Sequence, residues 1–310
     1  MIMMKTHRVT KTYSLVAVAL FAAASALFQV LHNIIGIPTG FGMTVDLVAL
    51  PVLLAFFIFG FEEALNVCVL MAILITLVSP ETWLGASMKF AGTLPMILLP
   101  ALWLLAGKKK NDSGRLAAIL ILSLVIPLFV FVLSGLIGAP LNPGGQGALA
   151  NVSSQQVLYT VPELETGGTV LVKESKVTPD MLFKGLAPIL GLAVVSLFML
   201  YLWRKYGGEV RISDLSDKKT IVIVTVLALI IRGVSMVVAN MYYAGPIFFG
   251  VQPEYFLTSI PLGTEWLFGP VQLPVWFLIL FWNVIQGVIE MSFAWGIAFK
   301  FKFAEYYGSS

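Results

Sequence analysis

The chain has 310 residues, of which 59% are hydrophobic and only 11% are charged. That is too little polar material to cover a soluble globule of this size, so the composition indicates a multi-pass protein of the cell membrane. The net charge of +3 comes from basic residues that flank apolar stretches, so no nucleic-acid partner is expected. One cysteine, Cys68, and two histidines point to no disulfide, no metal site and no cofactor.

Positive charge gathers in four short segments: before residue 12, and at 108–115, 204–219 and 300–302. Loops rich in Lys and Arg stay on the cytoplasmic side, so an even number of crossings must join each pair of neighbouring basic segments. This pattern predicts that both termini are cytoplasmic. The first apolar run is about 19 residues long, longer than the apolar part of a secretory signal, and we expect it to remain as the first helix.

Apolar runs along the chain predict an all-α integral membrane protein with about eight transmembrane helices, forming a single membrane domain over 1–310. The runs lie at 12–31, 45–60, 63–79, 89–106, 116–138, 182–203, 220–243 and 274–299. The long polar segment 139–180 is expected outside the cell, where two short β-prone stretches separated by Pro162 and Gly167-Gly168 favour a small hairpin.

Polar side chains inside apolar runs are candidates for a functional site, because each is costly in hydrocarbon unless it meets a partner, a cavity or water. Five lie toward the outer ends of the predicted helices and two nearer the middle of the membrane. They are Asp46, Lys89, Asn240, Asn283 and Gln286, and then Arg232 and Glu290.

The amides define the candidate substrate site. Asn283 and Gln286 are three residues apart and share one helix face, and Asn240 reaches a similar depth if its helix packs antiparallel to theirs. Amides both donate and accept hydrogen bonds, which suits a neutral heterocycle or a polyol better than a phosphate. The alternative is that the amides bond one helix to another.

The charged residues have two interpretations each. Arg232 and Glu290 lie on the same two helices as the amides, and we expect a structural or coupling pair between them, with direct substrate contact as the alternative. Lys89 contacts substrate or extends to the outer interface. Asp46 contacts substrate or caps the second helix.

Aromatic residues crowd the expected outer side, and Tyr242 is one of them. Interfacial belts explain many such residues. The segment 245–273 also carries five prolines, if the bordering Pro274 is counted, and this favours a stiff outer lid that stacks on a flat ligand. We therefore include Tyr242 among the candidate substrate-binding residues.

Small residues recur at four-residue spacing on the first helix, as Ala19 with Ala23 and Ala22 with Ala26. Such a face allows another helix to approach closely. The other helix belongs either to a partner protein or to this same chain, and spacing alone favours neither.

Three stretches resemble the substrate-binding S components of energy-coupling factor (ECF) vitamin transporters, most closely the riboflavin type. Thr44–Gly60 is similar to the second helix of that family, with an acidic residue and a proline leading to a closing glycine. The stretch from Arg232 to the Asn240-Met-Tyr-Tyr-Ala-Gly-Pro segment is similar to its Arg-containing helix. Phe281–Ile289 is similar to its last helix, except that Gln286 stands where the family pattern usually has Lys.

The resemblance implies a six-helix S-component bundle with an added helix pair over 107–219 that includes the outer insertion. It implies high-affinity capture of a vitamin, with riboflavin favoured, by a chain that is itself no enzyme. A transmembrane coupling subunit and two ATPase subunits would be the partners, with the alanine face of the first helix docking the coupling subunit. The chain has no phosphate-binding Gly-rich motif of its own.

Other functions remain as alternatives. Glu62 and Glu63 are similar to the paired carboxylates of one membrane protease family, but Val67 follows where that motif has Arg, and no later span carries a His. A stand-alone secondary transporter would use Arg232 and Glu290 as an ion-coupling pair. An S component for a different vitamin is the third alternative.

Overall fold

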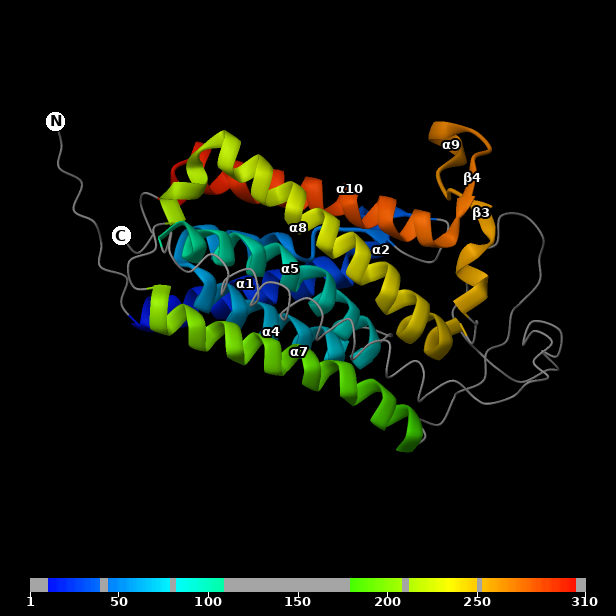
Figure 1. Ribbon diagram of the computed structural model, residues 1–310, viewed down its shortest axis with the longest axis horizontal. Coiled ribbons are helices and arrows are strands. Elements are labelled where there is room, and N and C mark those ends of the chain that lie inside the picture. Colours follow the sequence, from blue (N-terminus) through cyan, green and yellow to red (C-terminus); the bar gives the residue numbers. More distant parts are fainter. Residues whose placement is uncertain are drawn as a thin grey trace.

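The computed structural model describes residues 11–39, 44–78, 82–108, 179–207, 212–249 and 253–304. Its long helices run along the length of a single bundle (Figure 1). They are α1 (Lys11–Val30), α3 (Leu50–Phe59), α4 (Phe61–Val78), α5 (Thr82–Lys108), α7 (Pro179–Tyr206), α8 (Lys218–Ala239) and α10 (Val275–Trp295). The predicted helix at 116–138 and the insertion at 139–180 lie outside the described residues.

Short elements join the long ones. The helical pieces are α2 (His32–Ile35), η2 (Ile212–Ser216), the π-helix η3 (Asn240–Phe249), η4 (Pro253–Leu257), α9 (Glu265–Phe268) and the π-helix η5 (Gly296–Lys300). The strands are β1 (Ile37–Pro38), β2 (Thr44–Val45), β3 (Ser259–Pro261) and β4 (Gln272–Pro274). They form two antiparallel pairs, with Ile37 opposite Val45 in one and Ile260 opposite Leu273 in the other.

Six helical segments of the described residues are long and apolar enough to cross a bilayer. They are Thr12–Val30, Phe61–Val78, Leu84–Ala106, Ile189–Tyr206, Lys218–Gly245 and Val275–Lys300. The last two include the π-helices that extend α8 and α10. These six segments indicate a multi-pass helical membrane protein, as the composition predicts.

The predicted span at 45–60 is wrong in its length, because the helix there is only α3, with ten residues. Residues 44–49 form β2 and a turn instead. The Asp46 carboxylate accepts the Val48 N–H (3.1 Å), and the Ala49 N–H donates to Glu290 (3.2 Å), so side chains satisfy the backbone before the helix starts. At 1.5 Å per residue, α3 covers about 15 Å, roughly half of a 30 Å hydrocarbon layer.

The core of the bundle surrounds α3. Nine of its ten residues are buried, as expected for a helix that is apolar on every side. It packs against α1, α4 and α10, while α5 lies between α4 and α8. Gly60 ends α3 with φ +114°, a conformation that favours glycine, and α4 begins at the next residue.

The two ends of the bundle differ. At the end where α10 begins, the β3–β4 hairpin and α9 extend beyond the helices (Figure 1). At the opposite end, the Trp295 indole donates to the Leu215 carbonyl (3.0 Å) and holds η2 against α10. Asp217 caps α8 there by accepting from the backbone N–H and the hydroxyl of Thr220, and these bonds lower the pKa of its carboxyl group.

Candidate functional site

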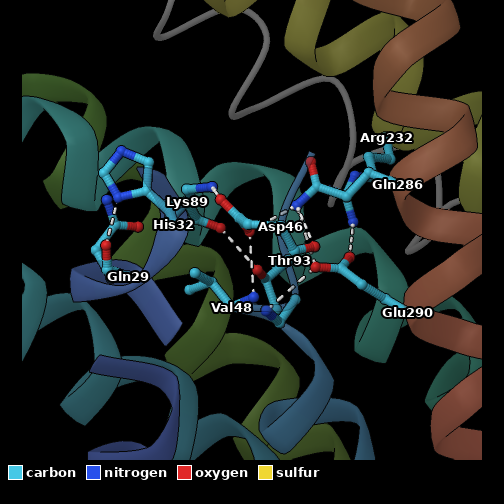
Figure 2. A network of polar contacts seen from close by, with 10 residues as sticks. Gln29, His32, Asp46, Val48, Lys89, Thr93, Arg232, Gln286 and Glu290 are labelled. Carbon is cyan, nitrogen blue, oxygen red and sulfur yellow. Dashed lines mark hydrogen bonds and ion pairs between the residues drawn. The ribbon is translucent and has the colours of Figure 1, made fainter. Parts of the chain in front are cut away.

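A chain of polar contacts crosses the interior of the bundle (Figure 2). Lys89 forms an ion pair with Asp46, and the Gln286 amide nitrogen donates to Asp46 Oδ1 (3.0 Å) and to Glu290 Oε1 (3.1 Å). Glu290 Oε2 accepts from the Arg232 guanidinium (2.7 Å). Five side chains from three helices and from the segment before α3 are thereby joined.

The segment before α3 contributes its backbone as well. Asp46 follows β2, and its own carbonyl oxygen is a third neighbour of the Gln286 nitrogen (3.3 Å). Ala49 directly precedes α3 and donates its N–H to Glu290. The cluster therefore includes the N-terminal end of α3, a helix about half as long as the hydrocarbon layer is thick. Backbone N–H groups at such an end have no partner within their own helix, so side chains can accept from them.

Two glycines lie beside the Arg232 side chain. A Cβ on Gly287 of α10 would lie 3.5 Å from Arg232 Cδ and only 2.4 Å from a Leu229 methyl carbon. A Cβ on Gly92 of α5 would lie 3.9 Å from Arg232 Nε and 3.3 Å from the Met236 sulfur. The guanidinium is thus enclosed between α5 and α10, and its Nε is buried without a hydrogen-bond partner in the described part of the chain.

The charges of this cluster balance. Lys89 and Arg232 face Asp46 and Glu290, so two basic side chains pair with two acidic ones. Arg232 is 4% exposed and Glu290 is fully buried, while the Lys89 side chain is 26% exposed. Pairing removes most of the cost of keeping these ions out of water, and the arrangement places the one partly accessible cation at the Asp46 end.

Asn240 and Asn283 bond to their own helices. The Asn240 amide nitrogen donates to the Met236 carbonyl, and the Asn283 amide nitrogen donates to the Ile279 carbonyl, each at 2.8 Å. Both residues are buried. Within the described residues, neither amide bonds one helix to another and the three predicted amides share no hydrogen bond, so their convergence on a ligand stays a prediction.

The side-chain oxygens of these amides, unlike their nitrogens, have no hydrogen-bond partner among the described residues. No described residue donates a hydrogen bond to the side-chain oxygen of Asn240, Asn283 or Gln286, and none of the three oxygens is sealed inside the core. Each amide therefore uses its nitrogen to hold the framework and keeps its oxygen available as an acceptor.

The π-helix η3 carries the aromatic candidate. Tyr242 is half-buried, whereas its neighbour Tyr243 is buried and shares a hydrogen bond with the Ser87 hydroxyl of α5 (3.1 Å). Gly245 is required here, because a Cβ would lie 2.4 Å from the Phe256 ring and 2.6 Å from the Asn240 carbonyl. Wide helical turns of this kind occur often at functional sites.

Two further polar groups were not predicted from the sequence. The Trp282 indole N–H and the Thr264 hydroxyl are buried and have no hydrogen-bond partner within the described ranges. Trp282 packs with Val45 and Leu262 in a small apolar cluster, separate from the main core, beside the β3–β4 hairpin. The signal in the sequence was the position of Trp282 directly before Asn283, next to a predicted site residue.

The alanine face of α1 is divided by the fold. Ala22 is buried against this chain's own helices, and Ala26 is half-buried. Ala19 and Ala23 are exposed. Only the latter pair is open to another protein in this conformation.

The contact between Asp46 and Lys89 was also missed, although both were candidates. The available signal was the presence of two opposite charges in neighbouring apolar runs, each at the end expected to face outward.

No family model, no curated protein and no solved structure matches the chain.

Proposed function

We propose that this chain is the membrane-embedded substrate-binding subunit of a vitamin uptake system of the ECF type, with riboflavin as its substrate. The observation that carries the proposal is the set of three amide oxygens left without a partner on Asn240, Asn283 and Gln286. Three acceptors suit a ligand with imide and hydroxyl donors, which riboflavin has.

The surroundings of the amides support the same ligand class. Tyr242, which is half-buried, follows Asn240 by two residues in η3, and Trp282, whose indole N–H is buried and unpaired among the described residues, directly precedes Asn283 on α10. Lys89 and Asp46 form the accessible end of the polar cluster. Aromatic side chains with a few well-placed polar groups are the usual lining of a site for a flat heterocycle.

In this proposal the chain is no enzyme, and both termini are cytoplasmic. The segment 107–219 is an added helix pair that contains an extracellular insertion at 139–180. ATP hydrolysis is supplied by two ATPase subunits through a transmembrane coupling subunit, for which the exposed Ala19 and Ala23 are the proposed docking residues.

The test begins with the protein purified in mild detergent. We expect a visible flavin absorption band, riboflavin among the released ligands by mass spectrometry, and quenching of added riboflavin fluorescence. A colourless protein that also leaves riboflavin fluorescence unchanged would reject riboflavin as the substrate. Asn283→Ala should weaken riboflavin binding about fivefold, since one hydrogen bond contributes about 1 kcal/mol, whereas Ser213→Ala on the exposed turn η2 should leave it unchanged.

A stand-alone secondary transporter is the second candidate, because the Arg232–Glu290 pair is buried deep in the bundle, where ion-coupling residues lie in such proteins. Proteoliposomes that contain this chain alone separate the two functions. Substrate accumulation driven by a proton or sodium gradient supports the secondary transporter. Binding without accumulation supports the ECF subunit.

A further inference from the structure

The amide of Gln286 lies between two carboxylates. Its nitrogen is 3.0 Å from Asp46 Oδ1 and 3.1 Å from Glu290 Oε1. An amide rotated by half a turn would place its oxygen against both carboxylate oxygens and lose both hydrogen bonds. The two acids therefore fix which end of the amide faces the framework.

The acids themselves are held in place. Asp46 accepts from Lys89 and from the Val48 N–H, and Glu290 accepts from Arg232 and from the Ala49 N–H. Neither carboxylate is free to turn away from Gln286 without breaking an ion pair and a backbone hydrogen bond. The orientation of the amide is thus set by neighbours that are themselves fixed.

The consequence appears at the other end of the amide. Figure 2 shows the Gln286 oxygen on the side away from both carboxylates, and no described residue donates to it. A glutamine normally offers a ligand either a donor or an acceptor, according to how its amide is turned. Here the donor is occupied, so Gln286 offers an acceptor only.

We propose that Asp46 and Glu290 are positioning residues that make Gln286 a dedicated hydrogen-bond acceptor, so that the site selects ligands with an N–H or O–H donor facing it. This inference rests on the proposed function and defines its substrate class more narrowly. A ligand that presents a carbonyl or carboxylate oxygen to Gln286 is rejected, because two acceptors would meet with no hydrogen between them.

The first part of the test removes the acceptor and keeps the framework. In Gln286→Lys the ammonium takes the place of the amide nitrogen as donor to both carboxylates and adds one positive charge to the cluster, while the side-chain oxygen is gone. The ligands are riboflavin, a riboflavin methylated on its imide nitrogen, and a series that each lack one hydroxyl of the sugar-alcohol chain. We expect one analogue to bind the wild-type protein about tenfold more weakly than riboflavin and to show no such difference in Gln286→Lys.

The second part tests the positioning role. In the double variant Arg232→Met with Glu290→Gln, no charge is left unpaired, and the new amide at 290 can face Gln286 with either its nitrogen or its oxygen. Asp46 alone then holds the Gln286 nitrogen, so the amide is less strongly fixed than in the wild-type protein. The measured quantity is the ratio of affinities for riboflavin and the sensitive analogue, which a purely structural change would leave near the wild-type value because both affinities fall together. We expect the ratio to fall toward one.

The possible results distinguish a failure of this inference from a failure of the proposed function. Flavin binding in which no analogue loses affinity, or in which the loss is the same in wild type and Gln286→Lys, overturns the inference and leaves the proposed function standing. A wild-type ratio retained in the double variant overturns the positioning role. Absence of flavin binding in the wild-type protein removes riboflavin and this inference together.

Discussion

Two ion pairs in this protein join the same kinds of groups in opposite surroundings. Arg232 and Glu290 pair inside the bundle, with 4% and 0% of their side chains exposed. Arg204 of α7 and Glu62 of α4 pair at the bundle surface, with 63% and 35% exposed. A buried ion depends on its partner because nothing else replaces water, whereas an exposed one exchanges its partner for solvent.

The difference extends to what surrounds each pair. The buried pair is joined to Gln286 and to the backbone of Ala49. The exposed pair links only the end of α7 to the start of α4. Changes at the buried pair should therefore alter stability and ligand binding together, while changes at the exposed pair should alter neither.

The largest expected effect follows from removing one buried partner. Arg232→Met leaves Glu290 as an unpaired buried carboxylate, and we expect a loss of about 3–5 kcal/mol in the free energy of unfolding. Thermal unfolding in detergent or lipid nanodiscs measures it. Adding Glu290→Gln should restore much of the lost stability, because the second change removes the unpaired carboxylate. If the double variant is no more stable than the single one, the cost comes from packing rather than from charge.

Asp46 tests the more accessible end of the same cluster. Asp46→Asn keeps the shape and an acceptor for Gln286 but leaves Lys89 without its counterion. Because the Lys89 side chain is 26% exposed, its ammonium can still reach water, and we expect a smaller loss of about 1.5–3 kcal/mol. The same unfolding measurement checks this. A loss equal to that of Arg232→Met would mean that Lys89 is as isolated from water as Arg232.

Gly287 tests how closely α8 packs against α10 beside the buried pair. A methyl group at this position would lie 2.4 Å from a Leu229 carbon, so Gly287→Ala should cost about 1–3 kcal/mol through forced repacking. Gly233→Ala is the matched control on α8, because its methyl group would meet the Leu280 side chain at an ordinary 3.4 Å. The control should be neutral or slightly stabilising, since alanine favours a helix. Equal effects at both positions would contradict a special role for Gly287.

The sequence predicted the long helices well, because an apolar run of about 20 residues has few alternatives in a bilayer. It failed at α3, where the helix starts at Leu50 and the N–H groups of the two preceding residues donate to nearby Asp46 and to distant Glu290. It also singled out each of the five residues that form the polar cluster, without testing whether they bind a ligand. It did not predict how they connect, since the contacts of Asp46 join residues 43 and 240 positions apart.

The smallest effect is expected at the exposed pair. Arg204→Gln removes the charge that faces Glu62, yet both side chains lie at the bundle surface near a basic end that also carries Lys205, Lys218 and Lys219. Glu62 then exchanges Arg204 for water or for another cation, so we expect an unchanged thermal midpoint and unchanged riboflavin affinity. Unfolding at low and high salt sharpens the comparison, because the surface pair should be screened and the buried pair should not. A destabilisation by Arg204→Gln that persists in high salt would show that the α4–α7 contact depends on this pair, and that exposure alone does not separate the two ion pairs.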